Sequence, residues 1–453
     1  MDSSKGREFP ALFAFSLIFI FTAVLFAQAY SGFSYQTSDA YERARSAQYL
    51  ISYGYPVQST AIGAGATSYP PIFDFSLAAV HQLTGLSYEL CEVALSFVYA
   101  ALFLCLGFLF SRVVLRELGK EPDEALCCLS GIAVFLSPWV FFLSITPVSD
   151  SLGMALCFLA VYFFYRQSKW LTFTILTVLS LAHFRSFLAC GICLGVLALY
   201  QRRIRELLFE SFLSILIFIY FVPKTALGFS NPLVITPGVF EFFSLALLLF
   251  GAAGVILLAF GRKFPPIIIA LFAAPVILSA FAPFAFRQLP FLVLPLAAVS
   301  VLFFEGFSDA FGPSTFRLAF FCVLAISALS INSFVTAKYL PLGPEASSVA
   351  YTVSQFNGRN VYADFVQSYA IPMYSPQKRV LLGSFAEELP DFSSRLYIDQ
   401  AITNGSIDSN AATLMQLYQI DLVESNYSAS YDPLGLGGDR VFQSDSYSAY
   451  SLS

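Results

Sequence analysis

Long apolar stretches separated by short polar connectors make up the first three quarters of the chain, and a polar region follows. The first stretch, Pro10–Tyr30, has 21 residues without a charge, close to the roughly 20 that a membrane-spanning helix needs. Further apolar stretches lie near residues 91–111, 125–143, 151–165, 170–184, 186–200, 207–223, 239–260, 264–281, 288–304 and 318–336. The pattern predicts a mainly α, polytopic membrane protein with about 11 transmembrane helices.

The basic residues predict how these helices are oriented. Lys5 and Arg7 precede the first stretch, which places the N-terminus in the cytoplasm. Ala27-Gln28-Ala29 imitates a signal-peptidase site, but the apolar run is longer than the usual core of roughly 7–15 residues, so we expect an uncleaved anchor. Alternation then puts 13 Lys and Arg residues inside and six outside before the polar tail. An odd number of helices leaves the C-terminal region outside.

The polar tail, residues 338–453, has the pattern of a small α/β domain. Short apolar runs lie within Asn360–Asp364, Arg379–Gly383, Ile420–Glu424 and Arg440–Gln443, and they alternate with helix-like stretches at 365–374 and 410–419. We therefore expect residues 1–337 to form the membrane domain, with a first extracytoplasmic loop at about 31–90. Residues 338–453 would form an extracytoplasmic domain, and sequons at Asn404 and Asn426 agree with that location.

The first loop contains two amphipathic stretches. Ala40, Ala44, Ala47 and Ile51 recur at helical spacing, which predicts a helix lying on the membrane surface and ending at Gly54 and Pro56. The second stretch, Ile72–Leu83, carries its polar side chains at Asp74, His81 and Gln82.

Composition narrows the class of protein. The chain is 57% hydrophobic and 12% charged, with a mean hydropathy of +0.72, whereas soluble domains carry about 25% charged residues. It has no basic cluster of the kind that binds nucleic acid. The eight cysteines all fall in the apolar part of the chain, so we interpret them as small buried apolar residues and not as disulfides.

Ionisable side chains gather near the predicted outer ends of the helices. A charge at the centre of a transmembrane helix costs about 2.5–3.5 kcal/mol on insertion scales, so such positions need an explanation. The group comprises Asp39, Asp74, His81, Glu89, Glu92, Asp150, His183, Arg185, Lys224, Glu241 and Arg287. Its members come from distant parts of the sequence and are predicted to meet one membrane face. A site there could hold the phosphate of a lipid carrier together with a hydroxyl acceptor.

The chemistry of such a site needs few groups. A sugar on a polyprenyl phosphate already has a good leaving group, and cations such as Arg287 or Arg185 can stabilise the developing phosphate charge. One positioned carboxylate can take the acceptor's proton, an effect typically worth about 100- to 10,000-fold. Asp39, directly after the first span, is our candidate for that base.

The acidic candidates also have structural interpretations. Asp39 could cap the helix that follows it, with Glu42 three residues later completing a capping box. Asp150 could likewise cap the next apolar helix.

The other candidates have similar alternatives. Arg185 and Arg287 could be interfacial anchors whose guanidinium groups reach the lipid headgroups. Asp74 and His81 could simply face water on an amphipathic helix. Tyr69-Pro70-Pro71 could be a rigid entry to the second helix.

The order of these features resembles the GT-C superfamily of polyprenyl-phosphate-sugar-dependent membrane glycosyltransferases, in its protein mannosyltransferase and aminoarabinose transferase branch. The resemblance rests on Ser38-Asp39-Ala40-Tyr41, Tyr69-Pro-Pro71, Leu136-Ser-Pro138 through Asp150, and Phe286-Arg287-Gln-Leu-Pro290. It implies that Asp39 acts on the acceptor and that Asp150 is the acidic residue of the second outer loop. Ser38 stands where many members carry another acidic residue, so a role for a divalent metal stays open.

We therefore predict a glycosyltransferase that moves a sugar from a polyprenyl-phosphate donor to a hydroxyl acceptor on a glycan, lipid or protein. The predicted catalytic residues are Asp39 and Asp150, and the predicted donor-phosphate residues are Arg287 and Arg185. We further predict that four residues contact the acceptor or support the first loop: Tyr41, Tyr69, Asp74 and His81. The predicted location is a prokaryotic plasma membrane. The alternatives are a lipid or small-solute transporter or flippase, and a non-catalytic membrane scaffold.

Overall fold

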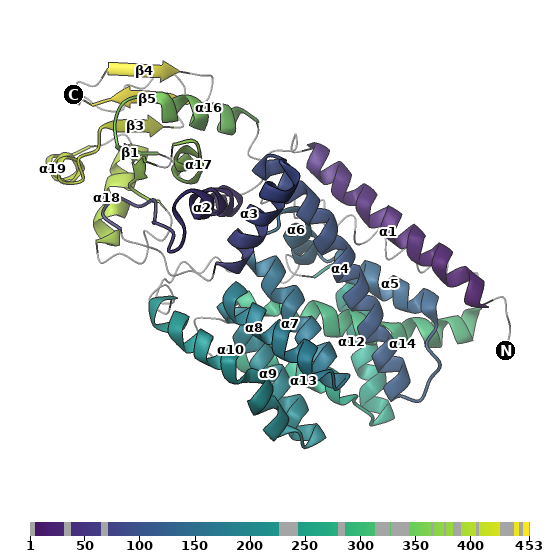
Figure 1. Cartoon of the computed structure of the whole chain (residues 1–453). Coiled ribbons are helices and arrows are strands. Elements are labelled where there is room, and N and C mark those ends of the chain that lie inside the picture. Colours follow the sequence, from purple (N-terminus) through teal and green to yellow (C-terminus); the bar gives the residue numbers. More distant parts are fainter. Residues whose placement is uncertain are drawn as a thin grey trace.

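The computed structural model describes residues 5–30, 38–64, 71–225, 243–279, 286–312, 327, 344–363, 367–375, 377–383, 391–404, 407–425, 439–443 and 447–452. A bundle of helices carries a small domain with a β-sheet at one end (Figure 1). The molecule is thus mainly helical with a small sheet, as the sequence predicts.

The bundle helices coincide with the apolar stretches of the sequence. They are α1 (Lys5–Tyr30), α4 (Tyr88–Glu117), α5 (Glu124–Phe135), α6 (Pro138–Ile145), α7 (Ser149–Tyr165), α8 (Lys169–Ala182), α9 (Phe184–Gln201), α10 (Ile204–Thr225), α12 (Leu245–Gly261), α13 (Pro266–Ser279), the 3-10 turn η3 (Phe286–Leu292) and α14 (Val293–Phe311). The predicted stretch at 318–336 lies outside the described residues, apart from residue 327.

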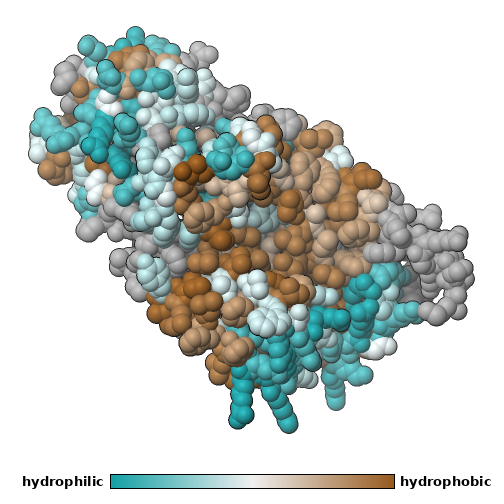
Figure 2. Space-filling view, viewed as in Figure 1, coloured by the Kyte–Doolittle hydropathy of each residue, from teal (hydrophilic) through white to brown (hydrophobic). Residues whose placement is uncertain are grey.

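The number of membrane-spanning helices stays a prediction. Within the described ranges, three helices are long and apolar enough to cross a membrane by length and composition: α4, α9 and residues 289–307. A fourth is counted if α5 and α6 form one span, although they bend by 74° at their junction. Pro138 begins α6, and proline cannot continue the hydrogen bonding of the preceding helix. Figure 2 shows an apolar surface over the helices between hydrophilic ends, as expected for an integral membrane protein.

Small residues let the bundle helices approach closely. A Cβ placed on Gly107 of α4 would lie 2.6 Å from the Cα of Gly131 in α5. Next to this contact, Ser111 donates a hydrogen bond of 2.6 Å to Ser130, which donates one of 2.7 Å to the Ala297 carbonyl in α14. Close backbone approach and interhelical hydrogen bonds are the usual means of helix association in membranes. Seven free cysteines lie in described residues and six of them are buried, as predicted.

The C-terminal region folds as an α/β unit, which we call the sheet domain (residues 344–452). Its strands are β1 (Asn360–Tyr362), β2 (Arg379–Val380), β3 (Leu422–Ser425), β4 (Asp439–Gln443) and β5 (Ser448–Ser451), in the order β2-β1-β3-β5-β4. Strands β1, β2 and β3 are parallel, whereas β5 pairs antiparallel with β3 and β4.

Four helices complete the sheet domain. They are α16 (Pro344–Gln355), α17 (Gln367–Tyr374), α18 (Phe392–Thr403) and α19 (Ser409–Leu417). The predicted runs correspond to β1 to β4, α17 and α19. The sequence reading did not identify β5, α16 or α18. The division of the chain at residue 337/338 stays a prediction, because this junction lies outside the described residues.

The first loop contributes α2 (Ser38–Tyr53) and α3 (Ile72–Thr84). Helix α2 ends as predicted, with Gly54 in a left-handed conformation (φ 80°). Its place on the membrane surface stays a prediction, and within the protein α2 packs between α3 and α17 of the sheet domain (Figure 1). Three charged residues of this helix are buried by these contacts, because Glu42, Arg43 and Arg45 are at most 8% exposed.

The chain after α2 joins the first loop to the sheet domain. The Ile62 amide donates to the Val380 carbonyl (3.0 Å), and the Val380 amide donates to the Thr60 carbonyl (2.9 Å). The loop therefore pairs in parallel with β2 at the edge of the sheet. Gly383 allows this approach, because a Cβ there would lie 2.6 Å from the Ala61 nitrogen. Two distant segments thus form one structural unit.

Candidate active site

Three bundle helices are tied together at the end that carries the sheet domain. The Gln28 side chain, near the C-terminus of α1, donates to Ser96 Oγ of α4 (3.0 Å) and to the Ile145 carbonyl at the end of α6 (2.6 Å). The short segment 146–148 follows directly and leads into α7. The bundle thus gathers the end of α1, the start of α4 and the segment before Asp150 at one end, which we call the domain-proximal end.

Asp150 forms a close pair with a histidine at this end. It lies in the first turn of α7 with its side chain 40% exposed, and its Oδ1 is 2.5 Å from Nε2 of His183. His183 is buried at the junction of α8 and α9. Gly153 makes room for it, because a Cβ on Gly153 would lie 2.5 Å from the His183 Cβ. The structure therefore connects two residues that are 33 positions apart.

The same histidine is held from its other side. The Ser186 amide donates to His183 Nδ1 (3.3 Å), so the imidazole caps the start of α9, and Ser186 Oγ is 2.8 Å from the same nitrogen. Sequence analysis identified His183 only as one of many polar residues. The available signal was its position beside Arg185 at a break between two apolar helices.

The other predicted catalytic and phosphate-binding residues are only partly described. The backbone places Asp39 in the first turn of α2 and Arg287 in η3, but both side chains lie outside the described part of the structure. Tyr69 lies outside it altogether. Arg185 is half-buried in the first turn of α9, two residues after His183. Their predicted roles stay predictions.

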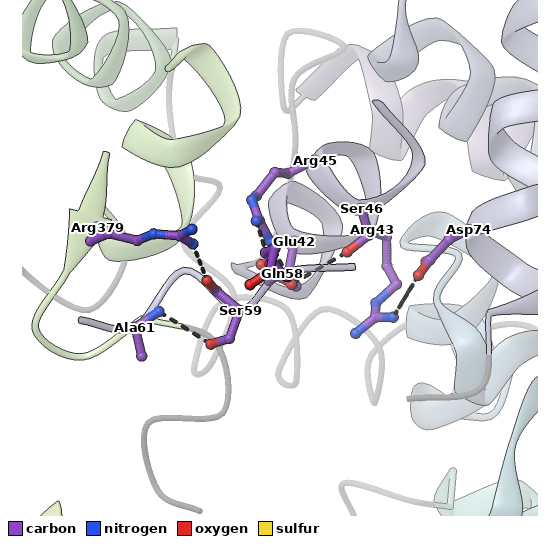
Figure 3. Close-up of polar contacts among 9 residues, drawn as sticks. All are labelled: Glu42, Arg43, Arg45, Ser46, Gln58, Ser59, Ala61, Asp74 and Arg379. Atoms are coloured by element: carbon purple, nitrogen blue, oxygen red, sulfur yellow. Dashed lines mark hydrogen bonds and ion pairs between the residues drawn. The ribbon is translucent and has the colours of Figure 1, made fainter. Parts of the chain in front are cut away.

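Asp74 is buried in an ion pair and does not face water. Its Oδ1 and Oδ2 are 3.3 and 3.2 Å from the Arg43 guanidinium, which reaches across from α2 (Figure 3). Burial raises the pKa of Asp74 to about 6, and the charge of Arg43 opposes that rise. The pair joins the two helices of the first loop.

Tyr41 and His81 occupy different surroundings. Tyr41 is fully buried in the apolar core shared by α2 and the sheet domain. His81, in α3, stacks on Tyr88 with ring centroids 4.3 Å apart, and its Nδ1 donates to the Leu86 carbonyl at 2.6 Å. Both residues support the first loop, and neither belongs to the pair at Asp150.

A second charge cluster fixes α2 against the chain that follows it (Figure 3). Arg45 pairs with Glu42 at 3.4 Å and donates to the Gln58 carbonyl at 2.5 Å, while Ser46 donates to Glu42 at 3.3 Å. Arg45 is 1% exposed. Buried charges persist when they are paired and hydrogen-bonded. Helix α2, which begins at Ser38, is therefore fixed against the chain that follows it.

Among the residues described, the candidate for chemistry at this site is Asp150. Asp150 is a partly exposed carboxylate whose Oδ1 is held by an imidazole, and a partly exposed carboxylate can accept a hydroxyl proton or bind a cation. No group of three or more His, Cys, Asp or Glu residues in the described ranges could hold a metal ion.

Neither a protein-family model nor a curated protein sequence matches the chain, but solved structures are similar to it. An Archaeoglobus fulgidus oligosaccharyltransferase has a TM-score of 0.64 at 12% identity, over 94% of this chain and 70% of that one. ArnT from Cupriavidus metallidurans has a TM-score of 0.58 at 12% identity, over 97% and 98% of the two chains. Arabinofuranosyltransferase AftD from Mycobacteria has a TM-score of 0.55 at 14% identity, over 99% and 41%.

Two of these proteins have been solved with lipid phosphates. The Archaeoglobus enzyme was solved with an inhibitory peptide and a dolichol-phosphate, and ArnT was solved with undecaprenyl phosphate. At 12–14% identity the likeness establishes a common fold.

Proposed function

We propose that this chain, which has the fold of the GT-C superfamily of membrane glycosyltransferases, transfers a sugar from a polyprenyl-phosphate donor to a hydroxyl acceptor at the extracytoplasmic face. The observation that carries the proposal is the likeness to ArnT, which extends over 97% of this chain and 98% of that one. Because ArnT was solved with undecaprenyl phosphate, a polyprenyl phosphate is the proposed carrier. Fold alone does not fix function, so residue chemistry has to support the rest.

The first loop supports Asp39 as the base. Buried ion pairs of Arg43 and Arg45 fix α2 against α3 and the following chain. Asp39 lies in the first turn of this helix. A catalytic group needs such a rigid support, because small displacements from the productive geometry reduce the rate.

The proposed reaction is an inverting displacement. The acceptor oxygen attacks the anomeric carbon while its proton passes to the Asp39 carboxylate. The bond between that carbon and the phosphate oxygen breaks, and its electron pair leaves with the lipid phosphate. Arg287 and Arg185 stabilise the charge that develops there. Asp150, at the domain-proximal end, binds a polar group of the substrates.

The test is a transfer assay of purified protein with a panel of radiolabelled polyprenyl-phosphate sugars. Asp39→Asn keeps the size of the side chain but removes the base, so we expect transfer to fall by about 100- to 10,000-fold. Asp123→Asn is the matched control, because Asp123 caps α5 and asparagine caps equally well. We expect that variant to retain wild-type transfer.

Three outcomes would contradict the proposal. Wild-type transfer activity of the Asp39→Asn variant would show that Asp39 is not the base. Movement of lipid-linked sugar between leaflets without a glycosidic product would favour a transporter, and neither product nor movement with any donor would favour a scaffold.

A further inference from the structure

We propose that His183 is a positioning residue for Asp150 and that Ser186 fixes which nitrogen of its neutral imidazole carries the proton. The expected effect on transfer kinetics rests on the proposed function. The hydrogen bonds of His183 can be tested without any transfer activity. Three observations carry the proposal: the hydrogen bonds around the imidazole, the packing that confines the ring, and the partial exposure of Asp150.

The hydrogen bonds define which nitrogen carries the proton. A backbone amide can only donate, so the Ser186 amide at 3.3 Å requires a lone pair on His183 Nδ1. In neutral imidazole the proton then lies on Nε2, which is 2.5 Å from Asp150 Oδ1. Ser186 Oγ, 2.8 Å from Nδ1, donates to the same lone pair. The chain of donors therefore runs from Ser186 through His183 to Asp150.

Packing prevents the ring from leaving this position. The His183 side chain is 8% exposed, and α7 lies against it at Gly153, where any side chain would collide with the His183 Cβ. Asp150, by contrast, has a 40% exposed side chain. One of its oxygens is thus bound to a fixed donor, while the carboxylate stays partly exposed. Such support is how enzymes hold a functional carboxylate.

Helix capping alone does not account for this arrangement. The cap of α9 uses only Nδ1, and the contact between Nε2 and Asp150 contributes nothing to it. The two roles can be separated with two substitutions. The Asn amide can replace Nδ1 and keep the cap, but it is too short to reach Asp150. The longer Gln side chain can place an N–H near the position of Nε2, but it caps helices less well.

The first test is a nitrogen NMR spectrum of protein labelled at histidine. The chain contains only two histidines, and the structure gives them opposite tautomers, because His81 donates from Nδ1 to the Leu86 carbonyl. We expect His183 to be protonated at Nε2 and unprotonated at Nδ1, with His81→Gln confirming the assignment. Asp150→Asn should shift the Nε2 signal, and Ser186→Ala should shift the Nδ1 signal.

A proton on Nδ1 of His183, or an Nε2 signal that does not respond to Asp150→Asn, would overturn the inference. This result does not depend on transfer activity. An inactive wild-type protein would therefore count against the proposed function. The NMR spectrum would still test the role of His183.

The second test compares kcat and KM of His183→Asn and His183→Gln, with the thermal stability of each. We expect His183→Asn to fold normally and to lose about 10- to 100-fold in kcat/KM, because the carboxylate is misplaced. His183→Gln should recover most of that loss even if it is less stable. Better activity for His183→Asn than for His183→Gln would show that the histidine only caps α9.

Discussion

At the residue scale, Asp74 shows how burial changes a carboxyl group that the sequence places on an amphipathic helix. Its side chain is 4% exposed, and Arg43 is its ion-pair partner at 3.2 Å. Loss of solvent raises its pKa to about 6 despite that partner. The desolvation penalty thus outweighs the Coulombic gain, as is common for buried ion pairs.

The raised pKa makes stability depend on pH. Its folded-state value of about 6 lies above the ordinary 3.8, so the folded protein binds this proton more tightly than the unfolded chain does. The stabilisation is full below pH 3.8 and is lost as the pH rises through about 6. The difference corresponds to about 3 kcal/mol in the free energy of unfolding. Asp74→Asn should remove this share of the pH dependence.

Thermal unfolding midpoints of the two proteins between pH 4 and 7 measure the effect. Asp439→Asn is the control, because Asp439 is exposed on β4 and its substitution should leave the profile of the wild-type protein unchanged. Parallel profiles for the wild-type protein and Asp74→Asn would show that Asp74 does not titrate in this range.

At the scale of the elements, glycines decide which helices can pack closely. Gly254 of α12 faces α14 so closely that a Cβ would lie 2.2 Å from the Val299 carbonyl oxygen. At Gly195 of α9, no described atom beyond the adjoining backbone of its own helix lies within 4 Å of the corresponding point. The two residues look alike in the sequence, since both interrupt apolar helices.

Gly254→Ala should therefore destabilise the bundle, because one methyl group forces α12 away from α14. We expect a cost of about 1–3 kcal/mol, typical of overpacking. Gly195→Ala should be neutral or stabilising by up to about 1 kcal/mol, because alanine favours the helix more than glycine does. Thermal unfolding of both variants in the same detergent provides the comparison, and equal midpoints would exclude a close α12–α14 contact.

At the scale of the whole molecule, Arg395 connects the first loop to the sheet domain. Its guanidinium donates to the Ile62 carbonyl (2.7 Å) and to the Leu381 carbonyl (2.8 Å), and it pairs with Asp391 at 3.1 Å. The side chain is 2% exposed. Arg395 of α18 therefore holds the first-loop segment around Ala61 beside β2.

Arg395→Ala should loosen this connection. We expect faster hydrogen exchange at the amides of Ile62 and Val380, because their mutual pairing loses its support. Exchange within the bundle, for example in α4, should not change. Arg440→Ala, an exposed arginine on β4 at the far edge of the sheet, is the control. If hydrogen exchange at Ile62 is unchanged in Arg395→Ala, the segment around Ala61 is held beside β2 by its backbone hydrogen bonds alone.

The sequence by itself determined the classes of structure and the positions of most elements. The apolar stretches that the structure describes became bundle helices, and the short runs after residue 360 became strands and helices of a sheet domain. Gly54 ends α2 as expected. These features are local: periodicity, helix breakers and length depend on neighbouring residues, so they can be read without knowing the fold.

Only the tertiary structure decided which surfaces meet. Periodicity shows that α2 has an apolar face, but it does not show that the sheet domain covers this helix and buries its charges. Likewise, Asp150 was a candidate from sequence, whereas its partner His183 lies across a helix pair. The strand pairing of Ala61 with Val380 joins residues more than 300 positions apart. Such contacts depend on how the chain closes on itself, and no local pattern encodes that closure.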